Sequence, residues 1–353
     1  MRLRKKIKAG LDWAGSRLAA KGGVLLYHRV DDKGHDPFNL CVSPKNFDEQ
    51  MAVLAQTGKA LSLDEFMARR KSGRLESGSV AVTFDDGYLD VFENALPILE
   101  KHGIPATVFV ATGNLGESFW WDRLAILIHE TATLPRVLDL PLDGERIAVG
   151  DTGRISRSEL FDLFYPIFNR VDPETRQSLF DTLEAIFAHP ALPPAPRAAT
   201  PAEISRAAGH PLVTIGAHTE THSRLVSLDY RNQVREIESS VDRLAGIVGA
   251  RVNAFSYPFG LRGRDYDEET IGAVAETGID HAFTADLNVV TSRTRPLAVP
   301  RLWVHDRSGR RFRRELQFWL GAPSSASAPV AASAPAESGP GATSRTLEPV
   351  AKD

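Results

Sequence analysis

Short apolar runs that alternate with helical patterns constrain the fold of this chain more than any other feature. The runs have the β-branched and aromatic content of buried strands. They lie at residues 24–28, 80–86, 106–112, 213–218, 253–260, 281–286 and 297–302. Between them, one helix is predicted to begin after Ser43 and to end at Gly58, and another to end at Gly103. This alternation predicts an α/β fold with a parallel sheet, and seven strands favour a closed barrel.

The chain divides into a predicted barrel at residues 23–320 and two terminal segments. Residues 1–22 are basic and mildly amphipathic and are expected to form a helix. Residues 321–353 are rich in Ala, Pro and Ser and are expected to be disordered. Residues 114–205 interrupt the barrel pattern with a Trp120–Trp121 pair, a hairpin turn at Asp143–Gly144 and two helical stretches. We expect an insertion that packs beside or over the barrel mouth.

Composition excludes several classes of function. The net charge of −3 gives no basic footprint for nucleic acid. A single cysteine, Cys41, excludes a disulfide framework within the chain and a Cys-rich zinc site. No apolar run is long enough to span a bilayer, and the first residues lack the apolar core of a secretory signal. We therefore expect a cytoplasmic protein whose basic N-terminus contacts membranes peripherally, if at all.

Two of the predicted strands end in residues that carry chemistry. Asp85 and Asp86 follow an apolar run, where adjacent carboxylates are either solvated or held by something positive. His218 and His222 end another run, and on a helical turn they would lie on one face. Two imidazoles and one carboxylate make a common site for a divalent ion with open positions. One aspartate would then bind the ion, and the other would act as a base beside it.

Each of these motifs also has a simpler interpretation. Asp-Asp-Gly after a strand is typical of a hairpin turn, and His-x-x-x-His pairs lie more often at surfaces or in cores than around metals. Their occurrence at strand ends of one parallel sheet favours the metal site. Glu220 lies two residues from each histidine, so a thermolysin-like protease is not indicated. At a third strand end, the N–H of Phe259 in the turn Tyr-Pro-Phe-Gly could face an oxyanion, although an ordinary aromatic turn explains it equally well.

The segments TFDDGY, HTETH and YPFG, in this order, resemble the polysaccharide deacetylase family, the NodB-homology carbohydrate esterases of the family 4 type. The resemblance covers residues 23–305 apart from the insertion. It implies a distorted seven-stranded β/α barrel in which Asp86, His218 and His222 hold a divalent metal ion. It also implies that Asp85 is the general base and that the N–H of Phe259 completes the oxyanion site.

The sequence departs from the family pattern in two places. The third motif of the family usually begins with an arginine that pairs with the base, and here Ser256 occupies that position. Arg301, at the end of the last predicted strand, is either its replacement or a surface arginine. The second departure concerns the general acid, which the family usually supplies from a late apolar strand that ends in His-Asp. Here both His28 and His305 follow apolar strands that would be neighbours in a closed barrel. We favour His28, because it directly ends a clean apolar strand.

These features predict a metal-dependent hydrolase that removes the acetyl group of an N-acetylated sugar or polysaccharide, a carbon–nitrogen bond outside peptides. Zinc is the expected ion, and cobalt and nickel fit the same ligands. The alternatives are a formamido, small amide or lipid-linked substrate, or a glycan-binding homologue without activity. The tryptophan pair would either stack on sugar rings or anchor the insertion.

Overall fold

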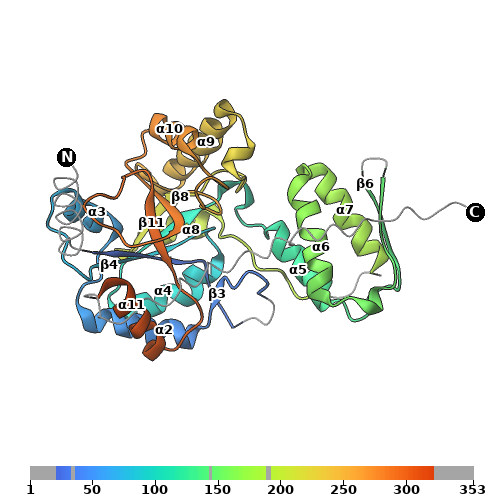
Figure 1. The fold of residues 1–353 in the computed structure, drawn as a ribbon, viewed down its shortest axis with the longest axis horizontal. Coiled ribbons are helices and arrows are strands. Elements are labelled where there is room, and N and C mark those ends of the chain that lie inside the picture. Colours follow the sequence, from blue (N-terminus) through green and yellow to red (C-terminus); the bar gives the residue numbers. More distant parts are fainter. Residues whose placement is uncertain (1–20, 33–35, 143–144, 188–191, 322–353) are drawn as a thin grey trace, which may run out of the picture. The chain divides into compact units, whose positions relative to one another are not determined.

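The computed structural model describes residues 21–32, 36–142, 145–187 and 192–321. They form two compact units (Figure 1). The barrel unit combines the chain up to Ser118 with the chain from Pro196, and the inserted unit spans residues 119–195. The predicted helix over residues 1–22 and the predicted tail over residues 321–353 lie almost wholly outside the described residues. Gly22 is not helical, because its N–H and carbonyl pair with Val290 at 2.9 and 2.8 Å.

The barrel is closed by seven strands, and every neighbouring pair is parallel. Around the barrel the strands are β1 (Gly23–Tyr27), β11 (Val299–Trp303), β10 (His281–Leu287), β9 (Ala254–Ser256), β8 (Val213–Ala217), β5 (Ala106–Val110) and β4 (Val80–Phe84). The predicted fold class is confirmed. All residues of β1, β4 and β5 are buried, as expected for strands covered on both faces. The barrel is distorted where β8 and β9 share a single aligned pair, Ala217 and Phe255.

Helices surround the barrel (Figure 1). They are α2 (Pro44–Thr57), α3 (Leu63–Lys71), α4 (Leu96–His102), α8 (Pro201–Ala208), α9 (Tyr230–Val248), α10 (Glu268–Glu276) and α11 (Gly309–Leu320). Short elements complete this unit: β2 (Arg29–Val30), β3 (Cys41–Val42), a π-helical turn η1 (Val91–Ala95), and the 3₁₀ turns η2 (Thr112–Asn114) and η4 (Leu225–Ser227). The predicted ends of α2 are correct, because Ser43 caps its start and Gly58 ends it in the left-handed conformation at φ 63°.

Aromatic and aliphatic side chains fill the interior of the barrel. The rings of Phe109 and Phe283 lie 5.5 Å apart within a cluster of buried residues. Gly216 on β8 makes room for this packing, since a β-carbon there would overlap the ring of Phe109. The interior of the barrel is therefore a packed core, and the chemistry is expected where the strands end, at their carboxyl ends.

The inserted unit is built from helices and one hairpin. Its elements are α5 (Trp120–Glu130), β6 (Leu138–Leu142), β7 (Glu145–Val149), a 3₁₀ turn η3 (Thr152–Arg154), α6 (Arg157–Arg170) and α7 (Pro173–Ile186). Three α-helices lie among the described residues of this unit, where two helical stretches were predicted. β6 and β7 are antiparallel on either side of the predicted turn, whose residues 143–144 lie outside the described part. The inserted unit covers fewer residues than the predicted insertion at 114–205, because α8 packs on β8 and α9 and belongs to the barrel unit.

Both tryptophans of this unit make contacts within it. Trp121 is buried and stacks on Phe119 at 4.5 Å. The half-buried ring of Trp120 stacks on Tyr165 at 5.1 Å and lies 4.9 Å from the guanidinium of Arg176. These contacts favour the interpretation that the pair anchors the inserted unit over the interpretation that it stacks on sugars.

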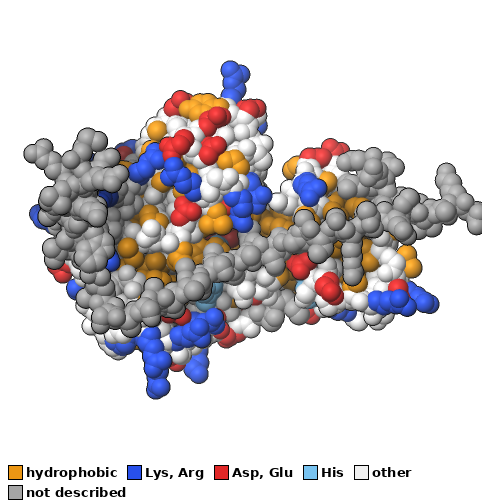
Figure 2. Space-filling view, in the orientation of Figure 1, with side chains coloured by type: hydrophobic (Ala, Val, Ile, Leu, Met, Phe, Trp, Pro, Cys, Tyr) orange, Lys and Arg blue, Asp and Glu red, His pale blue; other side chains and the backbone are white. Residues whose placement is uncertain are grey.

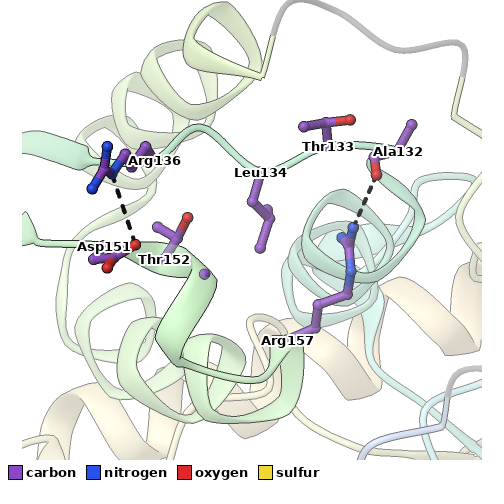
Figure 3. A pocket seen from close by; sticks show the side chains of 8 residues that line it. Ala132, Thr133, Leu134, Arg136, Asp151, Thr152 and Arg157 are labelled. Carbon is purple, nitrogen blue, oxygen red and sulfur yellow. Dashed lines mark hydrogen bonds and ion pairs between the residues drawn. The ribbon is translucent and has the colours of Figure 1, made fainter.

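A hollow of about 390 Å³ opens in the inserted unit between the end of α5 and the start of α6 (Figure 3). Arg157 donates from its lining to the carbonyls of Thr131 and Ala132, and Arg136 lies 4.0 Å from Asp151. These charges have protein partners, and none of the predicted site residues lines the hollow. We find no reason to place the chemistry there.

Neither sign of charge dominates the described residues on the face drawn in Figure 2. On the face drawn in Figure 2, described acidic and basic side chains are interspersed, in keeping with the small net charge. Within the described ranges, every helix is too short or too polar to cross a membrane.

Candidate metal centre and active site

The predicted site residues lie at the carboxyl ends of the barrel strands. His28 directly follows β1, Asp85 and Asp86 follow β4, and His218 follows β8. Arg301 is the central residue of β11, and its side chain reaches Asp85 after the end of β4. Because parallel strands of a barrel end at one mouth, these side chains share that end of the molecule.

The two aspartates after β4 begin a strained turn. Asp86 has φ 70° and Gly87 has φ 81°, and the N–H of Gly87 donates to the carbonyl of Asp85 at 2.9 Å. A β-carbon on Gly87 would lie 2.9 Å from Val110 of β5, so glycine is required there. A non-glycine residue such as Asp86 rarely adopts positive φ, and such strain is concentrated at functional sites.

Asp86, His218 and His222 form the one group of three potential metal ligands found among the described residues, with ligand atoms all within 4.8 Å of one another. The Oδ1 atom of Asp86 lies 3.4 Å from Nε2 of His218 and 3.3 Å from Nε2 of His222. Oδ1 is buried and has no hydrogen bond. In a tetrahedral site with metal–ligand distances of about 2.0–2.1 Å, ligand atoms lie about 3.3–3.4 Å apart. The spacing of these three atoms therefore fits a divalent ion.

The hydrogen bond on the far side of His218 supports the same conclusion. Its Nδ1 donates to the carbonyl of Ser256 at 2.8 Å, so the neutral ring presents the lone pair of Nε2 to Asp86. A lone pair facing a buried carboxylate oxygen needs a cation between them, either a proton or a metal ion. Such a backbone partner is also what fixes the orientation of histidines that bind metals.

Charges within this group shift its pKa values. Burial alone would raise the pKa of Asp86, but the close imidazoles of His218 and His222 hold that pKa well below its usual range. Burial alone would lower the pKa of His218, and the carboxylates of Asp85 and Asp86 raise it overall. The site thus favours a negative carboxylate beside positive charge.

The two histidines lie on a loop and not on the helical turn that their spacing predicted. Residues 218–224 carry no helix, and Thr219 and His222 have φ 63° and 56°. The N–H of His222 donates to Oγ1 of Thr219 at 3.0 Å, which closes the loop. The prediction of shared helical geometry was wrong, and left-handed residues bring the imidazoles together.

Asp85 forms a buried ion pair with Arg301. Nη1 and Nη2 of Arg301 donate to Oδ1 and Oδ2 of Asp85 at 2.7 and 2.6 Å, in the bidentate geometry that suits guanidinium and carboxylate. Arg301 is fully buried, so the alternative of a surface arginine is wrong. Burial alone would raise the pKa of Asp85, but Arg301 lowers it, and the carboxylate stays ionised.

All five N–H groups of Arg301 have acceptors. Besides Asp85, they reach the carbonyl of Thr284 at 2.9 Å, Oγ1 of Thr83 at 3.2 Å and Oγ of Ser256 at 2.7 Å. Ser256 in turn donates to Oδ2 of Asp85 at 3.0 Å. The residue that stands where the family has arginine thus contacts both partners of the pair.

Phe259 lies beside the potential metal ligand His222 and has a strained backbone. Its φ is 59°, and the next N–H, of Gly260, donates to the carbonyl of Pro258 at 2.6 Å. The Phe259 ring lies 4.9 Å from the His222 ring and 5.0 Å from the guanidinium carbon of Arg224. These contacts hold the turn against His222, one of the three potential metal ligands.

His28 and His305 have different surroundings. Burial lowers the pKa of half-buried His28, while Asp86 and Asp85 act in the opposite direction. Burial also lowers the pKa of His305, but the charges around it are Arg307, Glu315 and Arg311 on the outside of the barrel. Only His28 interacts with the charges of the proposed metal site.

A comparison with protein families decides the relationship. A model of the family described as "Polysaccharide deacetylase" matches residues 72–282. The chain belongs to the polysaccharide deacetylase family.

Relatives and solved structures agree with this membership. The chain is 42% identical to a poly-β-1,6-N-acetyl-D-glucosamine N-deacetylase of Staphylococcus aureus (strain MSSA476) over 80 residues, which are 22% of this chain and only 28% of that relative's length. The structure of IcaB from Ammonifex degensii matches 84% of this chain and 97% of its own, with a TM-score of 0.55 and 19% identity. The deacetylase PplD of Streptococcus pyogenes, solved with acetate, matches 86% and 99%, with a TM-score of 0.52 and 17% identity. The two structures establish the fold of this deacetylase family member.

Reasoning from the sequence missed Thr83 and Thr284 around the ion pair of this family member, and it treated Ser256 only as a departure from the family pattern. Thr83, Thr284 and Ser256 lie on barrel strands, and all three are buried. Thr83 donates to the carbonyl of Leu25 at 2.7 Å and accepts from Arg301. Hydroxyl residues inside otherwise apolar strands were the available signal, since a buried hydroxyl needs a partner.

Proposed function

We propose that this chain is a metal-dependent hydrolase that removes acetyl groups from an N-acetylated polysaccharide. The observation that carries the proposal is the spacing of Asp86, His218 and His222, in which a buried carboxylate oxygen faces two imidazole nitrogens without a hydrogen bond. Family membership supports the same reaction class. Poly-β-1,6-N-acetylglucosamine is the proposed substrate, because a relative named for it is 42% identical over the matched segment.

The proposed ligands fit zinc, and cobalt and nickel accept the same set. A divalent ion held there would polarise the acetamide carbonyl and make water more acidic. Asp85, ionised through its pair with Arg301, takes the proton of the attacking water. The N–H of Phe259 donates to the oxygen on which negative charge develops.

His28 completes the proposed reaction by donating a proton to the leaving nitrogen. Because burial lowers its pKa, its imidazolium is a stronger acid than a free one. The carbon–nitrogen bond then breaks, and the products are acetate and a free sugar amine. Asp85 thus takes up a proton from water and His28 supplies one to the leaving nitrogen. Cytoplasmic location remains a prediction from the sequence.

Release of acetate from β-1,6-linked N-acetylglucosamine oligomers tests the proposal. The protein is stripped with a chelator, reloaded with Zn²⁺ or Co²⁺, and compared with Asp85→Asn and His218→Ala variants. We expect metal-dependent release that both variants lose. Release from β-1,4-linked oligomers alone would refute the proposed polymer. One bound ion without release of acetate or formate from any of these sugars would refute the reaction class.

A further inference from the structure

The loop that carries His218 and His222 is held by a carboxylate from a neighbouring helix. Oε2 of Glu236, on α9, accepts hydrogen bonds from the N–H groups of Glu220 and Thr221 at 3.1 and 2.9 Å. The N–H of Glu220 also donates to the main-chain carbonyl of Glu236 at 3.1 Å. Oε1 of the same side chain accepts from Oγ1 of Thr221 at 2.8 Å. One half-buried carboxylate therefore binds two of the three residues that lie between the proposed metal ligands.

The opposite side of this loop is held through its carbonyl groups. The N–H of Thr112 donates to the carbonyl of Thr219 at 3.1 Å, and the N–H of Gly113 donates to that of Glu220 at 2.6 Å. A β-carbon on Gly113 would lie 2.6 Å from the same oxygen, so the contact depends on glycine. The loop is thus clamped between η2, which binds its acceptors, and Glu236, which binds its donors.

The loop needs this support because its backbone is strained. Thr219 and His222 both have positive φ, which costs of order 1–2 kcal/mol for each non-glycine residue. Without its outer partners, the loop would relax toward ordinary φ values and turn the His222 ring away from Asp86. Hydrogen bonds to a charged acceptor are about twice as strong as those between neutral groups, which suits a carboxylate to this task.

We propose that Glu236 is a positioning residue for the metal centre, acting through the 218–222 loop on His222. The inference rests on the metal site proposed above and adds a residue to it. The Glu236 carboxylate binds the backbone of the loop and the hydroxyl of Thr221, so its effect is on the affinity for the ion. Ligand orientation by residues outside the coordination sphere typically changes metal affinity 10- to 100-fold.

The test compares Glu236→Ala, Glu236→Gln and the control Glu238→Ala, an exposed carboxylate on the same helix. Metal-free protein is titrated with Co²⁺ in competition with a chromogenic chelator, and the visible spectrum of bound Co²⁺ is recorded. We expect affinity to fall at least tenfold in Glu236→Ala, with an altered cobalt spectrum, and to be unchanged in Glu238→Ala. Glu236→Gln should retain most of the affinity, because its amide oxygen still accepts and its amino group can donate to Thr221.

The outcomes separate this inference from the proposed function. Wild-type affinity and spectrum in Glu236→Ala would overturn the role of Glu236 while leaving the metal site in place. Absence of cobalt binding in the wild-type protein would overturn both. Should Glu236→Ala fold poorly by circular dichroism, Glu236→Gln and Thr221→Val decide. Thr221→Val removes one of the three hydrogen bonds to the Glu236 carboxylate and should lower the affinity for Co²⁺ less than threefold. A loss of affinity as large as that of an Asp86→Asn variant would count against the proposal.

Discussion

Replacement of Arg301 by methionine should destabilise the barrel by about 3–5 kcal/mol at pH 7, the cost of removing one partner of a buried ion pair. The structure supports the upper part of this range. Arg301 is 0% exposed, and its five N–H groups all have acceptors. Asp85 would lose two charge-assisted hydrogen bonds and keep only that from Ser256.

The deficit should depend on pH, and its sign follows from Asp85. In the wild-type protein the pKa of Asp85 lies below its usual range, so its stabilising contribution is complete above the unfolded pKa of about 3.9 and is lost as pH falls through the folded pKa. Without Arg301, burial would raise the folded pKa above the unfolded one. The folded variant would then bind more protons than its unfolded chain, so its deficit should grow from pH 4 toward neutrality.

Urea titrations at pH 5 and pH 7 in the presence of chelator measure the effect. Hydrogen exchange of peptides from β4 and β11 reports the barrel separately from the inserted unit. The double variant Asp85→Asn/Arg301→Met, in which both buried charges are absent, should recover at least about 1 kcal/mol. The exposed Arg310→Met is the matched control. A loss below about 1 kcal/mol at pH 7, an equal loss at both pH values, or no recovery in the double variant would refute the reasoning.

Three further substitutions test other parts of the molecule. His28→Asn should lower kcat at least about 100-fold with unchanged metal content, whereas His305→Asn should have little effect, and the reverse result would reassign the general acid. Gly87→Ala should lower the free energy of unfolding by about 1–3 kcal/mol in urea, because of its positive φ and the contact with Val110, and a neutral result would mean that this turn relaxes freely. Trp120→Ala should lower the Tm of the inserted unit and leave KM unchanged, while a raised KM with unchanged Tm would favour sugar stacking.

The seven strands could be predicted because strands of a closed parallel barrel are buried on both faces. Val80–Phe84 is buried throughout, and its sequence is a continuous apolar run interrupted only by Thr83. Strand ends were less accurate where apolar residues continue past the sheet. The predicted strand at 253–260 ends at Ser256 in the structure, because the aromatic residues that follow leave the sheet in a turn. Hydrophobicity indicates burial, and burial continues into such turns.

The residues predicted for the site do come together in the structure, but partly for a different geometric reason. The spacing of His218 and His222 suggested one face of a helix, but a loop with two left-handed residues joins them. Positive φ at threonine and histidine has no signature in the residue types. The contact of Glu236 with the loop could not be predicted for a related reason. Glu236 lies 16 residues beyond Glu220, and the two come into contact only because α9 packs on β8. Contacts of this kind depend on tertiary structure.

The position of Arg301 shows why a missing motif residue need not mean a missing interaction. In a closed barrel, inward side chains from different strands converge on the same interior points. β11 neighbours β1, and β1 neighbours β4, so a guanidinium from β11 reaches the carboxylate that follows β4. Ser256, on β9, is small enough to leave room for it and donates to the same carboxylate. The departure at Ser256 was the reason to consider a glycan-binding homologue without activity. Arg301 on β11 supplies the positive charge beside Asp85 that the family pattern places at position 256, so that alternative loses its main support.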